Sequence, residues 1–114
     1  MDLKLIQERI RRFRDARDWM QFHNPKNLAI SISIEANELL EHFQWKTLEE
    51  SEAYAAKAKD EIADEVADVA AYLIEFADNL GIDLQEAILN KLEKNEAKYP
   101  AEKARGNAKK YTEL

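Results

Sequence analysis

The sequence predicts an all-α protein, and three observations support this fold class. Almost half of the 114 residues are hydrophobic, and only two glycines and two prolines interrupt the chain. Apolar residues recur at helical spacing along most of its length. A chain of this size fits one ordinary domain, so we expect residues 1–114 to form a single domain built as a four-helix bundle.

The first two of the four predicted helices are separated by a clear break in periodicity. The first, over about residues 3–17, carries apolar residues at helical spacing among basic ones. After the break, Asn24 supplies an N-cap and Pro25 a favourable first-turn residue. The second helix is therefore predicted to begin at Pro25 and to continue to about Gln44.

The third and fourth helices are marked by capping residues. Thr47 and Glu50 resemble a capping box, after which helical periodicity continues to Gly81. For the early part of this run a loop is the alternative. Asp83 and Glu86 form a second such pair and open a fourth helix that ends before Pro100, whereas the tail has no strong periodicity.

Composition and charge exclude several classes of function. The chain has no cysteine, so disulfides and zinc–thiolate sites are excluded. It has no apolar run long enough to span a bilayer. The N-terminus is charged from Asp2 onward and lacks the apolar core of a signal peptide. We therefore expect a cytoplasmic protein without membrane contact. The net charge is −6, and both ends of the chain are basic, so the acidic excess lies in the middle helices. Such a surface repels phosphates and argues against nucleic acid as a partner.

Two pairs of acids lie beside the predicted apolar faces. Glu35 and Glu38 border the apolar stripe of the second helix, and Glu65 and Asp68 border that of the third. Antiparallel packing would bring the two pairs together, where the carboxylates would repel one another unless a cation is present. Oxygen ligands of this kind suit Mg²⁺, with Mn²⁺ as the alternative. Because the chain has 23 acidic residues, solvated helix surface is the competing interpretation.

The histidines do not indicate a di-iron site. Ferritin-like di-iron bundles use E-x-x-H units, and neither His23 nor His42 lies three residues after a glutamate. His42 shares a helical stripe with Glu35 and Glu38, but a lone helical histidine is more often packed or solvated than a ligand. We therefore do not assign His42 to the metal.

Motifs across nearly the whole chain resemble those of one enzyme family. The chain contains the pairs "EANE" at 35–38 and "EVAD" at 65–68, together with the segments "RDWMQFHNPKNLA", "FQWKT", "KYP" and "KYTEL". These motifs resemble those of the MazG-like all-α nucleoside triphosphate pyrophosphohydrolases, and among them the dCTP pyrophosphatase branch. The resemblance implies a MazG-like bundle and Mg²⁺-dependent hydrolysis between the α and β phosphates. The products would be a nucleoside monophosphate and pyrophosphate, with dCTP or a modified dCTP as substrate in nucleotide-pool house-cleaning.

The resemblance also implies roles for particular residues. The metal ligands and catalytic groups would be Glu35, Glu38, Glu65 and Asp68. One of the three glutamates could also orient the attacking water. The substrate contacts would be Trp19, Met20, Gln21, Phe22, His23, Trp45, Tyr72, Lys91 and Asn95. Aromatic faces in this set can stack on a nucleobase.

The second helix predicts self-association. Ile30 and Ile34 lie opposite its main apolar stripe, so one chain cannot cover both sides, and we expect a homo-oligomer. The resemblance implies a tetramer built as a dimer of dimers, with each site lined by more than one chain. Trp19 and Trp45 flank opposite ends of this helix, so they could contact one base only from different subunits.

Two other functions are compatible with the same sequence. Ile10 stands where animal members of the branch have a substrate-contacting histidine, which favours a pyrophosphohydrolase of broader specificity as one alternative. The other alternative is a non-catalytic helical interaction module whose acids keep it in solution.

Overall fold

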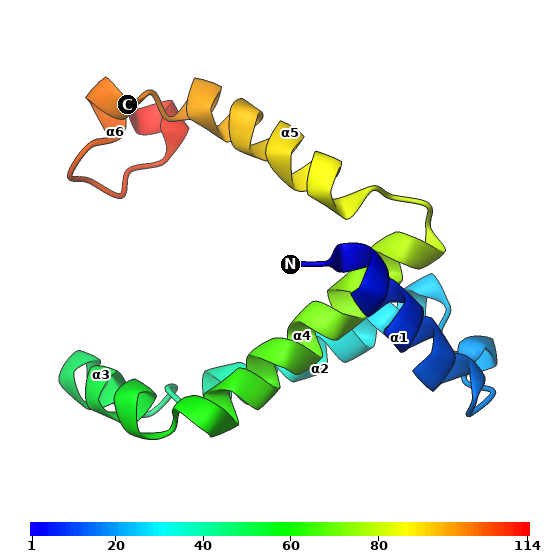
Figure 1. Cartoon of the computed structure of the whole chain (residues 1–114). Helices are drawn as coiled ribbons and strands as arrows, with labels where there is room; N and C mark the ends of the chain where they lie inside the picture. Colours follow the sequence, from blue (N-terminus) through cyan, green and yellow to red (C-terminus); the bar gives the residue numbers. More distant parts are fainter. The chain divides into compact units, whose positions relative to one another are not determined.

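The computed structural model describes all 114 residues and contains helices but no strand, which confirms the all-α prediction (Figure 1). Two compact units comprise residues 1–80 and 81–114. That the whole chain makes one domain stays a prediction. None of its helices combines the length and the apolar character needed to cross a membrane. The elements are α1 (Leu3–Asp15), the 3₁₀ turn η1 (Met20–Phe22), α2 (Pro25–Glu41), α3 (Leu48–Lys57), α4 (Lys59–Asn79), α5 (Leu84–Lys98), α6 (Ala101–Ala104) and the 3₁₀ turn η2 (Tyr111–Glu113).

The predicted caps begin the helices as expected. The side chain of Asn24 accepts a hydrogen bond from the first turn of α2. At the start of α3, the Glu50 backbone N–H donates to Thr47 Oγ1 at 3.1 Å, and the Thr47 N–H donates to Glu50 Oε1 at 3.0 Å. The side chain of Asp83 likewise accepts the Glu86 N–H at 3.0 Å at the start of α5. Each bond satisfies a backbone donor that a helix end leaves unpaired.

The predicted third helix is divided into α3 and α4 at Ala58. Alanine favours helix, so nothing in the local sequence marks this break. Ala58 is only 8% exposed, so the break lies at a packed position of the chain. The bend also lets Tyr54 of α3 reach back to His42 at the end of α2, where its hydroxyl lies 2.6 Å from His42 Nδ1. The early part of the predicted third helix, for which a loop was the alternative, is therefore the separate helix α3.

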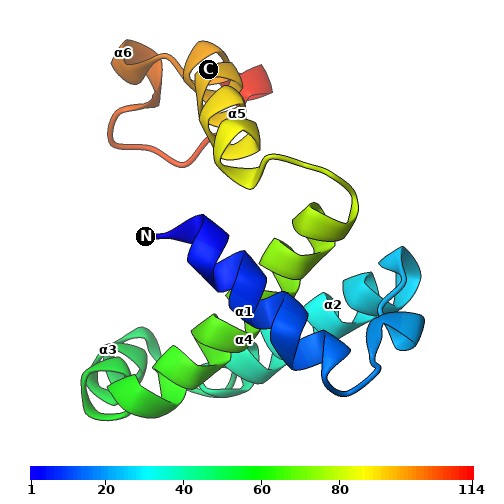
Figure 2. The same cartoon turned by 45° about the vertical axis from the view of Figure 1, so that its right-hand side comes forward.

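The core of the first unit is the packing of α2 along α4 (Figure 2). The side chain of Leu28 on α2 is 1% exposed, and Ile74 and Ala77 on α4 are buried with it. The two helices are antiparallel, because His23, just before α2, contacts Glu75 near the end of α4, while His42, just after α2, lies beside Glu65.

Helix α1 is held against the same stretch of α4 by polar contacts. Arg11 Nε donates to Asp78 Oδ2 at 2.7 Å, and this hydrogen bond lowers the pKa of Asp78. The largely buried guanidinium of Arg14 donates to Asn79 Oδ1 at 3.0 Å and lies 4.0 Å from the buried Glu75 carboxylate. These contacts fix how α1 crosses α4 and so shape the space between them.

One side of α2 remains uncovered within the chain. Ile30 and Ile34 are 48% and 51% exposed, as their position opposite the buried stripe predicts. Two aliphatic side chains one turn apart add to the exposed apolar surface of this unit.

Truncation of Leu28 tests whether the α2–α4 contact is the core. We expect Leu28→Ala to lower the free energy of unfolding by about 2–5 kcal/mol, because a fully buried side chain leaves a cavity. Leu48→Ala is the matched control, since Leu48 is 88% exposed and its truncation should change stability by less than about 0.5 kcal/mol. Urea denaturation at one fixed protein concentration measures both, and equal effects would contradict this assignment of the core.

Candidate metal centre and adjoining pocket

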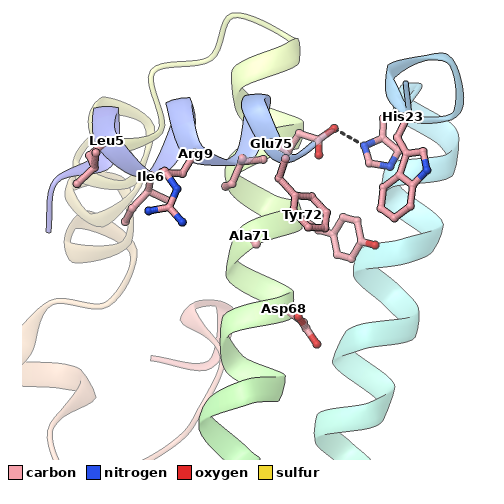
Figure 3. Close-up of a pocket in the computed structure, with 11 residues that line it drawn as sticks. Leu5, Ile6, Arg9, His23, Asp68, Ala71, Tyr72 and Glu75 are labelled. Atoms are coloured by element: carbon pink, nitrogen blue, oxygen red, sulfur yellow. Dashed lines mark hydrogen bonds and ion pairs between the residues drawn. The ribbon is translucent and has the colours of Figure 1, made fainter. Parts of the chain in front are cut away.

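Antiparallel packing gathers three carboxylates between α2 and α4. Glu35 and Glu38 lie one turn apart on α2, and Glu65 lies on the facing side of α4. One oxygen from each of the three lies within 4.8 Å of the others. Asp68 is outside this group of atoms, one turn further along α4, where its side chain points toward α2 (Figure 3).

The carboxylates are strained by burial and by one another. Oε2 of Glu35 and Oε2 of Glu65 are buried without any hydrogen-bond partner. Burial raises the pKa of Glu35 to about 7, with further contributions from the neighbouring Glu38, Asp68 and Glu65. Burial and Glu38 likewise raise the pKa of Glu65. A buried charged oxygen without a partner is costly, so the arrangement favours protonation or a bound cation.

A divalent cation fits this donor set. The ion pairs of Arg11 and Arg14 lie elsewhere, and no lysine or arginine pairs with the cluster. The imidazole of His42 lies beside it, with Nε2 3.9 Å from Glu65 Oε1. The remaining donors are carboxylate oxygens, which hard cations such as Mg²⁺ and Mn²⁺ take as ligands. The two orphaned oxygens are the groups that an ion would satisfy.

A cavity of about 630 Å³ adjoins this cluster on the α1 side of α4. Asp68 belongs to its wall and lies one turn from Glu65 on α4, so the cavity and the cluster adjoin at this residue. Figure 3 shows the α4 side chains of Asp68, Tyr72 and Glu75 along one edge. The lining is otherwise mostly apolar and comprises Leu5, Ile6, Arg9, Ile10, Phe13, Trp19, His23, Asp68, Ala71, Tyr72 and Glu75.

Three of the predicted substrate contacts lie in the wall of this cavity. These are Trp19, His23 and Tyr72. The indole of Trp19 packs edge-on against Phe13 with ring centroids 5.7 Å apart. His23 Nδ1 lies 2.7 Å from Oε2 of the buried Glu75 (Figure 3), which holds the imidazole at the wall. The cavity therefore offers aromatic surface beside a region of concentrated negative charge.

The other predicted contacts lie outside the cavity wall. Met20, Gln21 and Phe22 make up η1, where the Gln21 amide donates to the Asp18 backbone carbonyl at 2.9 Å. Trp45 is 87% exposed in the turn after α2. Lys91 and Asn95 lie on α5 in the second compact unit, the lysine exposed and the asparagine half-buried.

The structure also places residues near the site that sequence reasoning did not assign. His42 shares the helical stripe of Glu35 and Glu38, which was the available signal for its position. Its partner Tyr54 and the wall residue Glu75 had no sequence signal, because their positions depend on the bend at Ala58 and on the crossing of α1.

Comparisons with known proteins agree on one family. The model of the MazG-like family matches residues 30–114. The chain is 41% identical over 104 residues to dCTP pyrophosphatase 1 of Homo sapiens and 40% identical to that of Bos taurus, in each case over 90% of this chain. The crystal structure of a pyrophosphatase from Archaeoglobus fulgidus superimposes with a TM-score of 0.83 at 44% identity, covering 88% of this chain and 94% of that one.

The chain therefore belongs to the MazG-like family. Within it, the predicted resemblance to the dCTP pyrophosphatase branch is confirmed. The chain spans 61–62% of the length of these curated relatives.

The raised pKa of Glu35 predicts how stability changes with pH. With a pKa of about 7 in the folded state against 4.5 ordinarily, the native protein binds more protons than the unfolded chain between these values. In EDTA, the midpoint of thermal unfolding should therefore fall from about pH 5 to about pH 7 and level off above. Glu35→Gln should remove most of this slope, whereas Glu41→Gln, at an exposed position on the same helix, should keep it. A wild-type midpoint that rises across this interval would contradict the assignment.

Proposed function

We propose that this protein is a Mg²⁺-dependent nucleoside triphosphate pyrophosphohydrolase. It cleaves between the α and β phosphates and releases a nucleoside monophosphate and pyrophosphate. The observation that carries the proposal is the group of Glu35, Glu38 and Glu65 with two orphaned buried oxygens, beside a cavity walled by aromatic side chains. Similarity to proteins named dCTP pyrophosphatase 1 and to a pyrophosphatase supports the reaction class.

The residues divide into two groups of roles under this proposal. Glu35, Glu38, Glu65 and Asp68 hold the metal, which when bound supplies charge neutralisation and an activated water. One of these glutamates also orients that water. Trp19 offers an aromatic face for the base, and Tyr72 and His23 offer polar atoms to the sugar or the phosphates. Lys91 and Asn95 would provide further phosphate contacts.

The proposed substrate is dCTP or a modified dCTP, as in nucleotide-pool house-cleaning. The relatives' names and the aromatic residue Trp19 in the cavity support this choice. Ile10 supports a second candidate, a pyrophosphohydrolase of broader specificity, because it gives the cavity wall an apolar group that cannot hydrogen-bond a base.

A test of the reaction measures pyrophosphate release from canonical and 5-substituted nucleoside triphosphates, with and without Mg²⁺. We expect Mg²⁺-dependent release with a preference for deoxycytidine triphosphates. Equal turnover of purine and pyrimidine substrates would favour the broader enzyme, and no release from any of them would leave the non-catalytic module.

Neutralising a proposed ligand separates a metal site from a structural ion pair. Glu38→Gln and Asp68→Asn should lower activity by about 100-fold or more. Metal-free, both variants should be as stable as the wild type or more so, because a repulsive charge is removed. Mg²⁺ should raise the unfolding midpoint of the wild type by mass action but should not raise the midpoints of the two variants. A structural ion pair would instead cost about 3–5 kcal/mol on substitution, and Glu41→Gln controls for loss of an exposed charge on α2.

We further propose that the protein is a homo-oligomer, a tetramer assembled as a dimer of dimers. The exposed Ile30 and Ile34 on α2 provide an apolar surface that a second copy can cover. Trp45, exposed in the turn after α2, would then be free to reach a site on another subunit.

Sedimentation tests this assembly. The wild type at micromolar concentration should sediment as a species larger than the 13.2 kDa monomer, and Ile34→Lys should shift it toward smaller species because a charge replaces a buried contact. Ala53→Lys adds the same charge at an exposed position on α3 and should leave the assembly unchanged. A wild type found only as the monomer would refute the oligomer.

A further inference from the structure

His42 lies at the edge of the carboxylate cluster rather than apart from it. It follows α2 directly, and its Nε2 is 3.9 Å from Glu65 Oε1, with 18% of the side chain exposed. Spacings of three and four residues place Glu35, Glu38 and His42 along one stripe of the helical path. The imidazole thus lies beside Glu65, at the end of the cluster nearest α3.

The orientation of the imidazole is fixed by its other nitrogen. His42 Nδ1 is 2.6 Å from the hydroxyl of Tyr54. Tyr54 is held in turn, since its ring packs edge-on against Phe43 at 5.9 Å and the Lys46 ammonium lies 4.1 Å above it. Only Nε2 is then left for a further partner. Metal-binding histidines in proteins are typically held by a hydrogen bond at the second ring nitrogen.

Building on the function proposed above, we propose that His42 Nε2 is a nitrogen ligand that joins the carboxylates around the divalent ion, with Tyr54 as its positioning residue. Two ligand atoms each about 2.1 Å from one ion can be at most about 4.2 Å apart. The 3.9 Å separation between His42 Nε2 and Glu65 Oε1 is within that limit. The ligand atoms that all lie within 4.8 Å of one another belong to Glu35, Glu38 and Glu65, so His42 would join the ion from the Glu65 side of this group.

A nitrogen ligand changes which ions the site prefers. Carboxylates and water suit Mg²⁺, whereas imidazole is a ligand that transition-metal ions accept more readily. The site therefore binds Mn²⁺ more tightly than its carboxylates alone would, while Mg²⁺ affinity depends little on His42. This preference distinguishes a ligand from a histidine that only packs beside the cluster.

Pulsed EPR with Mn²⁺ as the only added metal tests this directly. We expect the wild type to show hyperfine coupling from a directly bound ¹⁴N, and ¹⁵N-histidine labelling to change that coupling. His42→Phe should abolish it. The chain has only one other histidine, so His23→Gln is the matched control and should retain it.

Affinity measurements complete the test. His42→Phe should weaken Mn²⁺ binding by about tenfold or more, and Tyr54→Phe should weaken it while the nitrogen coupling persists. Mg²⁺ affinity, measured by competition, should change by less than about twofold in both variants. If Mn²⁺ binds the wild type, if that binding requires Glu38 and if no nitrogen coupling is seen, the role of His42 is overturned and the proposed function stands. Failure of Mn²⁺ to bind the wild type at all would overturn the role of His42, whereas the proposed function is decided by Mg²⁺-dependent release of pyrophosphate.

Discussion

The antiparallel packing of α2 on α4 is the contact on which the rest of the structure depends. It buries Leu28 and, through the same geometry, forces Glu35, Glu38 and Glu65 into one small volume. Apolar burial stabilises the helix pair, while like charges at its centre oppose it. Because no lysine or arginine pairs with these carboxylates, the balance is left to protons or to a cation. The helix pair that holds the first unit together is therefore also the one that carries the candidate metal site.

A second set of contacts shapes the space next to that centre. The Arg11–Asp78 pair sets how α1 crosses α4, and the His23–Glu75 contact ties the segment before α2 to the same helix. The cavity is what remains between these elements, with Trp19 and Tyr72 in its wall. The Glu75 carboxylate is buried and would be costly without partners, so its contact with His23 and its closeness to Arg14 of α1 favour this arrangement of the elements.

Local interactions explain which features the sequence predicts. Caps at Thr47 and Asp83 act within three residues, and the carboxylate pairs follow from helical spacing plus one assumption, antiparallel neighbours. The bend at Ala58 and the contact between Tyr54 and His42 could not be predicted, because both depend on packing between distant segments. No sequence pattern marks Glu75, which is 4% exposed and contacts His23 from the segment before α2. Sequence reasoning thus identified the acids that repel one another and missed the groups that orient their surroundings.

The cavity draws its two walls from different parts of the chain, and this has a consequence for how the protein can diverge. The acidic cluster belongs to α2 and α4 alone, whereas residues such as Arg9 and Ile10 come from α1, which is joined to α4 by a few polar contacts. Substitutions on the inner face of α1 can alter which ligand fits without moving a carboxylate. Under the proposed function, reactivity and selectivity would then be separately mutable, so gene duplicates of such a chain could change substrate while the carboxylate cluster stays intact.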